Sequence, residues 1–156
     1  LEGMGTTMVA ALIVNGRIYV ANVGDSRAYL IDRDGAMQIT RDHSFVQYLV
    51  DIGKLTPEEA RKSSKKNIIT RAVGVDREVS VDVSVIEKKQ YAGKTLLLCS
   101  DGLSNYIDAP ALAPLRREHP DGEAFVKTLI DEANRAGGSD NITAVAVELD
   151  KPEEEV

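Results

Sequence analysis

The spacing of apolar residues predicts β structure in the first third of the chain. Residues 8–14 form an almost unbroken apolar run, which is typical of a buried strand. Asn15-Gly16 then indicates a tight hairpin turn, and residues 17–23 are largely apolar on both faces. Two further strands are expected at residues 27–31 and 37–40. We predict that these four strands form an antiparallel meander.

The pattern becomes helical between residues 42 and 72. Apolar positions in residues 45–52 recur at helical spacing and stop at Gly53. Thr56-Pro57-Glu58-Glu59 combines a capping box with proline at the first helical position, which predicts a short helix to about residue 62. A basic, serine-containing stretch follows at 61–66. We interpret residues 42–72 as a lid, or flap, inserted between strands, although an ordinary helical connection explains the pattern equally well.

Strands and helices alternate in the remainder of the chain. Strands are expected at 79–87, 95–99 and 142–149, and helices at about 109–118 and 122–136. Asp121 is the predicted N-cap of the second helix, and Gly137-Gly138 ends it. With 156 residues and no internal repeat, residues 1–150 are predicted to belong to one domain. The acidic tail 151–156 is expected to be disordered.

Composition and charge exclude several classes of partner. The net charge is −6 and the basic residues are dispersed, which argues against nucleic acid or an anionic membrane surface. No apolar run approaches the roughly 18 residues of a membrane span, so no membrane contact is expected from this chain. Cys99 is the only cysteine, so no internal disulfide can form. A reducing compartment, the cytoplasm, is the expected location.

Three aspartates occupy positions suited to metal binding. Asp25 and Asp101 each follow a buried strand, and Asp140 precedes another. If those strands are neighbours, the three carboxylates gather at one end of the sheets. Oxygen ligands without Cys or His favour Mg²⁺ or Mn²⁺ over Zn²⁺ or copper. The alternative is that each aspartate is an ordinary turn residue at a strand end.

Other candidates for chemistry are weaker. Ser26 and His43 could form the nucleophile and base of a serine hydrolase, but the residues around Ser26 do not form a G-x-S-x-G elbow. Ser26 fits a turn hydroxyl better, and His43 fits a position at a helix N-terminus. The glycine-rich stretch 3–7 lacks the G-K-[ST] ending of a nucleotide-binding loop.

Taken together in this order, several short motifs resemble the metal-dependent PPM family of protein serine/threonine phosphatases, the type 2C phosphatases, and its bacterial branch in particular. The motifs that carry the resemblance are Gly3-Met4-Gly5-Thr6-Thr7, Val23-Gly24-Asp25-Ser26-Arg27, Asp42-His43-Ser44, Ser100-Asp101-Gly102 and Asp140-Asn141-Ile142-Thr143. The similarity extends from residue 3 to about residue 149. It implies an α+β fold, an α-β-β-α sandwich of two antiparallel sheets flanked by helices.

The resemblance also implies a function and its residues. Asp101 and Asp140 would bind the second of two core Mn²⁺ or Mg²⁺ ions, and Asp25 with Asp101 would hold a third. A water bridging the core metals would hydrolyse phosphoserine or phosphothreonine in substrate proteins, among them a cognate Ser/Thr kinase in a signalling system. Residues 42–72 would be the family's flap, with His43, Ser44, Ser63 and Ser64 as its candidate substrate residues.

The chain also departs from the family pattern. The family's N-terminal portion, with a metal-bridging Asp-Gly motif and two helices, has no counterpart here, and Ser63-Ser64 replaces a common His-Pro pair. We therefore expect a C-terminal fragment with an incomplete sandwich, weak or absent metal binding, and no activity alone. Its exposed sheet face would favour self-association. The alternative function is a non-catalytic binding or regulatory domain of the same fold.

Overall fold

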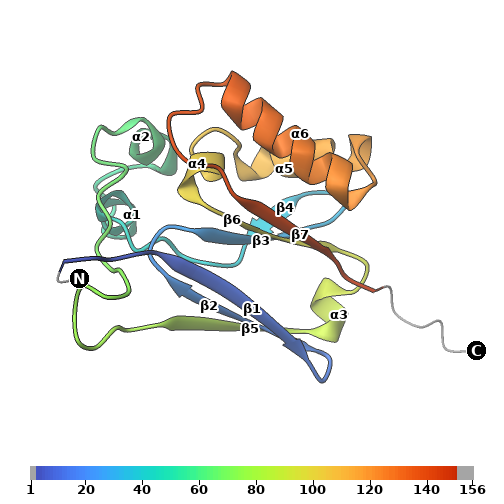
Figure 1. Ribbon diagram of the computed structural model, residues 1–156, viewed down its shortest axis with the longest axis horizontal. Helices are drawn as coiled ribbons and strands as arrows, with labels where there is room; N and C mark the ends of the chain where they lie inside the picture. The colour runs from blue at the N-terminus through green and yellow to red at the C-terminus, as the bar shows by residue number, and fades with distance from the viewer. Residues whose placement is uncertain (1–2, 151–156) are drawn as a thin grey trace, which may run out of the picture.

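The computed structural model describes residues 3–150, which are arranged in three layers (Figure 1). Two antiparallel sheets pack face to face, and two helices cover the outer face of the larger sheet. The tail 151–156, predicted to be disordered, lies outside the described residues. The family-level expectation of two antiparallel sheets with flanking helices is confirmed.

The smaller sheet has three strands in the order β1-β2-β5, and the larger has four in the order β4-β3-β6-β7. The strands are β1 (Met8–Val14), β2 (Arg17–Val23), β3 (Arg27–Ile31), β4 (Ala36–Gln38), β5 (Asp82–Glu87), β6 (Thr95–Cys99) and β7 (Ala144–Glu148). The helices are α1 (Phe45–Asp51), α2 (Pro57–Lys62), α3 (Lys88–Tyr91), α4 (Asp101–Ser104), α5 (Ala109–Glu118) and α6 (Gly122–Arg135).

The predicted four-stranded meander is wrong. β1 and β2 form the expected hairpin, and β3 pairs with β4, but β2 and β3 lie in different sheets. The chain crosses from one sheet to the other at residues 24–26. Strands that are apolar on both faces fit an interior position in either layer, so the pattern along β2 and β3 does not specify which strand lies beside them.

The two faces of the larger sheet are buried against different layers. On β3, Tyr29 and Ile31 pack on the side of the helices, whereas Leu30 faces the smaller sheet. On β6, Leu97 packs on the side of the helices and Leu96 faces the smaller sheet. All five side chains are at most 3% exposed. The prediction that residues 95–99 are buried on both faces is confirmed.

Helix α6 is held to the larger sheet by an apolar stripe with helical spacing. Phe125, Leu129 and Ala133 are fully buried. They are spaced four residues apart and therefore lie on the same face of the helix. Asp121 accepts a hydrogen bond from the amide of Ala124, as expected of an N-cap. Both the helix and its cap were predicted from the sequence.

The flap contains two short helices at one end of the sheets (Figure 1). Ser44 caps α1, and Thr56 with Glu59 forms the predicted capping box of α2. The flap is closed at its base because Phe45 donates its amide to Ile68 and Thr70 donates to His43. The ends of the insertion are thus hydrogen-bonded to each other.

Smaller differences concern local structure that lacks a strong pattern. The strand predicted at 79–87 begins only at Asp82, and the strand predicted at 142–149 is limited to residues 144–148. The helices α3 and α4 were not predicted, because four residues are too few to show helical periodicity. No helix in residues 3–150 is long and apolar enough to cross a membrane.

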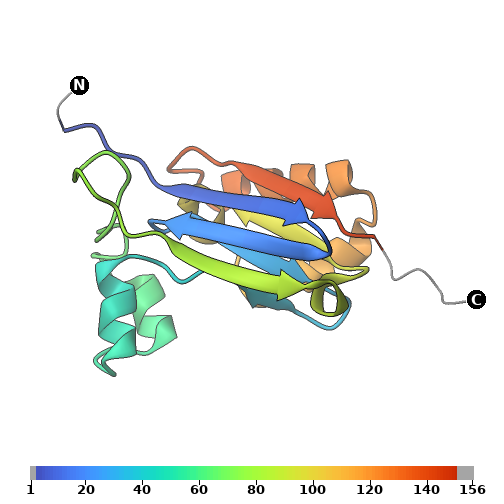
Figure 2. The same cartoon turned by 90° about the horizontal axis from the view of Figure 1, so that it is seen from below.

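The outer face of the smaller sheet is apolar and, within residues 3–150, no helix lies over it (Figure 2). Leu12 on β1 is 62% exposed, and Val83 and Val85 on β5 are 59% and 51% exposed. The register places Tyr19 between Leu12 and Val85, so these side chains form one surface across the three strands. We call this surface the open face.

We expect Phe125→Ala to lower the free energy of unfolding by about 3–5 kcal/mol, because it leaves a cavity between α6 and the larger sheet. Urea denaturation measures this change. Lys127→Ala, at an exposed position of the same helix, is the matched control and should shift stability by less than about 0.5 kcal/mol. Equal effects of the two substitutions would contradict the assigned packing of α6.

Candidate functional site

The three predicted metal ligands lie at the same end of the two sheets. Asp25 is in the crossover between β2 and β3, Asp101 is the first residue of α4, directly after β6, and Asp140 is in the loop before β7. Arg27, the first residue of β3, pairs with Cys99, the last of β6. Antiparallel pairing between these strands therefore brings the residues on either side to a common edge.

Electrostatic coupling links the aspartates in series. Burial raises the pKa of Asp25 to about 6, with a further contribution from the negative charge of Asp101. The pKa of Asp101 is also raised, first by burial and then by the charge of Asp140. Within residues 3–150, however, no three Asp, Glu, His or Cys side chains are close enough to form a complete metal site. The charges of Asp25 and Asp101, and those of Asp101 and Asp140, thus interact, but the three side chains do not form one cluster.

Asp25 has the properties of a carboxylate that needs a cation. It is 9% exposed, and in residues 3–150 no Lys, Arg or His forms an ion pair with it. A buried carboxylate without a counter-ion is costly, because the charged form loses its hydration. The nearby donors are carboxylate oxygens, which suit a hard dication such as Mg²⁺ or Mn²⁺. The chemistry of these residues therefore suits the implied metal, but residues 3–150 do not complete a site for it.

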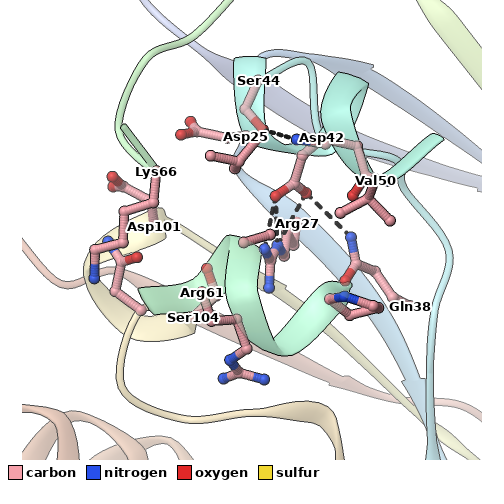
Figure 3. A pocket seen from close by; sticks show the side chains of 15 residues that line it. Asp25, Arg27, Gln38, Asp42, Ser44, Val50, Arg61, Lys66, Asp101 and Ser104 are labelled. Carbon is pink, nitrogen blue, oxygen red and sulfur yellow. Dashed lines mark hydrogen bonds and ion pairs between the residues drawn. The ribbon is translucent and has the colours of Figure 1, made fainter. Parts of the chain in front are cut away.

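A cavity of about 230 Å³ opens between this edge of the sheets and the flap. Asp25 and Asp101 face it from one side, and Ser44, Arg61 and Lys66 face it from the flap (Figure 3). Lys66 lies near enough to Asp101 for its positive charge to oppose the rise in the pKa of that carboxyl. The cavity thus has acidic residues at the strand ends and basic residues on the flap.

A partly buried ion pair forms one wall of the cavity. Arg27 donates from Nε and Nη2 to Asp42, at 2.9 and 2.6 Å, and from Nη1 to the hydroxyl of Tyr29. Gln38 also donates to Asp42, at 3.1 Å (Figure 3). Charge-assisted, bidentate hydrogen bonds of this kind fix both partners. The charges of Arg27 and Asp42 therefore compensate each other.

The loops carrying Asp101 and Asp140 contact each other through the backbone. A Cβ on Gly102 would overlap the carbonyl oxygen of Asn141, so only glycine permits this approach. Ser100 donates its hydroxyl to that same carbonyl at 3.2 Å and accepts the amide of Thr143 at 3.0 Å. These contacts join the loop after β6 to the loop before β7.

The candidate flap residues differ in their positions. Ser44 lines the cavity and accepts a hydrogen bond from the Gln47 amide. His43 is 7% exposed and lies behind the cavity wall. Ser63 is the C-cap of α2, and neither it nor Ser64 lines the cavity.

The serine hydrolase alternative has no geometric support. The hydroxyl of Ser26 is 2.9 Å from that of Thr7, and the ring nitrogens of His43 are bonded to Gly24 and Asp82. A nucleophile and its base must be within hydrogen-bond reach of each other. Ser26 lies directly before β3, and its hydroxyl is bonded to the side chain of Thr7.

Sequence reasoning did not single out Arg61 and Lys66. The basic stretch 61–66 was visible, but the residues around Asp101 lie far away in the chain. Only the folding of the flap over the strand ends places Lys66 near that carboxylate. A run of charged residues usually forms a solvated surface, so no individual residue in this stretch could be chosen from the sequence.

Comparisons with known proteins agree with this fold. The family model of protein phosphatase 2C matches residues 2–47. The serine/threonine phosphatase stp of Listeria innocua is 41% identical over 148 residues, which are 95% of this chain and 58% of that protein. This chain thus spans less than two thirds of that relative's length.

Two solved structures are similar in sequence and fold. The serine/threonine phosphatase Stp1 from Staphylococcus aureus superposes with a TM-score of 0.90 at 40% identity, over 96% of this chain and 58% of that one. The catalytic domain of the phosphatase PstP, solved with two manganese ions, gives a TM-score of 0.82 at 40% identity, over 96% of this chain and 61% of that one. In its two-sheet fold and in the order of its motifs, this chain is similar to proteins of the protein phosphatase 2C family.

Proposed function

We propose that this chain is the C-terminal part of a metal-dependent protein serine/threonine phosphatase that hydrolyses phosphoserine and phosphothreonine in proteins. The observation that carries the proposal is the cavity in which the carboxylates Asp25 and Asp101 face the basic flap residues Arg61 and Lys66. The carboxylates can bind a metal ion, and the positive charge on the flap can attract the phosphate group of the substrate. The similar proteins from Listeria innocua and Staphylococcus aureus are serine/threonine phosphatases, which supports the same conclusion.

Asp101 and Asp140 would hold a core Mn²⁺ or Mg²⁺, and Asp25 with Asp101 would hold a further ion. The charge coupling from Asp25 to Asp101 and from Asp101 to Asp140 supports this assignment, as does the manganese bound by the related PstP. When bound, the metal would supply positive charge that activates water and offsets the charge of the phosphoryl group.

The flap would recognise the phosphate and the peptide around it. Lys66 brings positive charge to a cavity whose other wall is acidic, and the hydroxyl of Ser44 faces the same space. Arg61 also lines the cavity, although its guanidinium is 3.5 Å from the carboxylate of Asp108, outside it. Long-range attraction between these cations and a phosphate dianion would draw the substrate in. We assign substrate contact to these three residues in preference to Ser63 and Ser64, which do not line the cavity.

The Arg27–Asp42 pair would shape the cavity without contacting the metal. Asp42 accepts from both Arg27 and Gln38, so its charge is already balanced. This leaves Asp25 and Asp101 as the cavity carboxylates with charge available for a cation. We also propose a cytoplasmic signalling role in opposition to a Ser/Thr kinase, for which the single buried thiol of Cys99 is compatible support.

One observation favours the alternative of a non-catalytic domain for the chain in isolation. Residues 3–150 do not provide three clustered metal-binding side chains. Asp101 and Asp140 must then hold a dication while repelling each other. Metal affinity should be weak unless a further carboxylate is supplied from elsewhere in the protein.

In the full-length protein, Asp101→Ala should lower kcat/KM for a phosphopeptide by at least about a hundredfold. Loss of a metal ligand removes several kcal/mol of charge stabilisation in the transition state. Phosphate release in the presence of Mn²⁺ measures the effect, and chelation of the metal should abolish activity. Asp34→Ala, at an exposed turn, is the matched control. Unchanged activity of the Asp101 variant would refute the metal assignment.

The 156-residue chain alone should show little or no phosphatase activity, because its carboxylates form pairs and no complete site. The same phosphopeptide assay with Mn²⁺ tests this expectation, with the full-length protein as the positive control. Robust metal-dependent hydrolysis by the chain alone would overturn it.

We further propose that the chain alone self-associates through the open face. Its apolar residues cover three adjacent strands, and the free edge of β1 has no strand partner within residues 3–150. Exposed apolar patches and unpaired strand edges both promote association between copies.

Sedimentation should detect dimers of the chain at micromolar concentrations and a monomer for Leu12→Lys, because a charge on the open face opposes its burial. Met37→Lys replaces a similarly exposed apolar residue, 59% exposed on β4 of the other sheet, and should leave the dimer intact. A clean monomer of the unsubstituted chain at high concentration would refute self-association.

A further inference from the structure

A buried histidine lies where the flap, the Asp25 loop and the smaller sheet meet. The side chain of His43 is 6% exposed, and the residue directly precedes Ser44, the N-cap of α1. It does not line the cavity. Its contacts nevertheless extend to both structures that form the cavity walls.

One set of contacts holds the loop that carries Asp25. Nδ1 of His43 accepts the amide of Gly24 at 3.0 Å, and the amide of His43 donates to the carbonyl of Gly24 at 2.9 Å. Gly24 has a φ of +103°, and a Cβ there would overlap Thr7. The backbone just before Asp25 therefore adopts a conformation that favours glycine, and both its polar groups are bound by one residue.

The other ring nitrogen connects to β5 and to the segment after the flap. Nε2 of His43 is 2.9 Å from Oδ2 of Asp82, whose Oδ1 accepts from Arg71 at 2.8 Å. Because Gly24 contributes a donor, Nδ1 must be the acceptor, and the proton of the neutral ring is on Nε2. The hydrogen bonds thus select one tautomer.

The backbone of the same residue anchors the flap. The carbonyl of His43 accepts the amide of Thr70 at 2.8 Å, and Ser44 forms a bridge with Ile69. The segment that returns from the flap is thus held by His43 at Thr70 and, through Asp82, at Arg71. Any shift of the ring would act on both the Asp25 loop and the base of the flap.

We infer that His43 is a positioning residue that ties the orientation of the Asp25 carboxylate to the position of the flap through its two ring nitrogens. Nδ1 sets the loop that carries Asp25, and Nε2, through Asp82 and Arg71, sets the flap base. The inference rests on the proposed phosphatase function for its kinetic consequences. Its structural part, the tautomer and the two separate attachments, does not depend on that function.

Two substitutions separate the attachments. In His43→Asn the side-chain oxygen takes the place of Nδ1 and can accept from Gly24, but nothing reaches Asp82. In His43→Gln the side-chain amide takes the place of Nε2 and can donate to Asp82, but Gly24 loses its acceptor. Each variant thus keeps one half of the connection.

In the full-length protein, His43→Gln should weaken Mn²⁺ binding by about 10–100-fold, the range seen when a residue that orients a metal ligand is lost. It should also lower kcat and speed hydrogen exchange of the Gly24 amide. His43→Asn should bind Mn²⁺ within about threefold of the unsubstituted protein and raise KM for a phosphopeptide with kcat largely kept. Calorimetry, NMR and steady-state kinetics measure these quantities.

The other histidine, His119 at the C-cap of α5, provides matched controls. His119→Asn and His119→Gln should leave Mn²⁺ affinity, KM and Gly24 exchange unchanged. Nitrogen NMR of the unsubstituted protein should show His43 with its proton on Nε2. The opposite tautomer, or equal effects of the two His43 variants on Mn²⁺ affinity and on KM, would overturn the inference.

The outcomes also separate this inference from the proposed function. If the unsubstituted protein neither binds Mn²⁺ nor hydrolyses the phosphopeptide, the proposed function fails. In that case, only the rate of hydrogen exchange at the Gly24 amide tests the positioning role. Faster exchange in His43→Gln than in His43→Asn supports it, and equal exchange refutes it.

Discussion

The apolar contact between the two sheets holds together groups that otherwise repel each other. Ile18 and Val20 of β2 pack against Leu30 of β3 and Leu96 of β6, and all four are at most 3% exposed. Burial of each such side chain contributes about 1.5–3 kcal/mol. The raised pKa values of Asp25 and Asp101 show the opposing effect, since charged carboxylates at the strand ends lower stability. The core offsets this cost and fixes the separation of the strand ends.

The elements with strong local signals were predictable from the sequence, and their partners in space were not. The stripe Phe125, Leu129 and Ala133, with the cap at Asp121, specified α6, and the capping box at Thr56 specified α2. These signals lie within a few residues of each other. The division of strands between two sheets depends on long-range pairing, which an apolar run on both faces of a strand does not reveal.

The candidate site shows the same division between local and long-range information. Strand-end positions and the family motifs indicated Asp25, Asp101 and Asp140, and the structure places them at one end of the sheets. The proximity of Lys66 to Asp101, and the pairing of Arg27 with Asp42, depend on how the flap and the β4–α1 connection fold back. Nothing in the local sequence around His43 showed that both its nitrogens would be bonded.

Charges of opposite sign reach the cavity from different structural units. The acidic groups are attached to strand ends that the core holds, whereas Arg61 and Lys66 belong to an insertion that is hydrogen-bonded at its base and ion-paired to Asp108 through Arg61. The electrostatic potential in the cavity therefore depends on where the flap lies. Small displacements of the flap would change the attraction for an anionic ligand while the carboxylates remain in place.

The close approach of Gly102 to the carbonyl of Asn141 has a consequence for how the site can vary. Because main-chain atoms of the two loops are in contact, the backbone sets the distance between Asp101 and Asp140. Side chains elsewhere in the site can be exchanged one at a time with local effects. A bulkier residue at position 102 would instead displace Asp101 and Asp140 together, so these two loops behave as one structural unit.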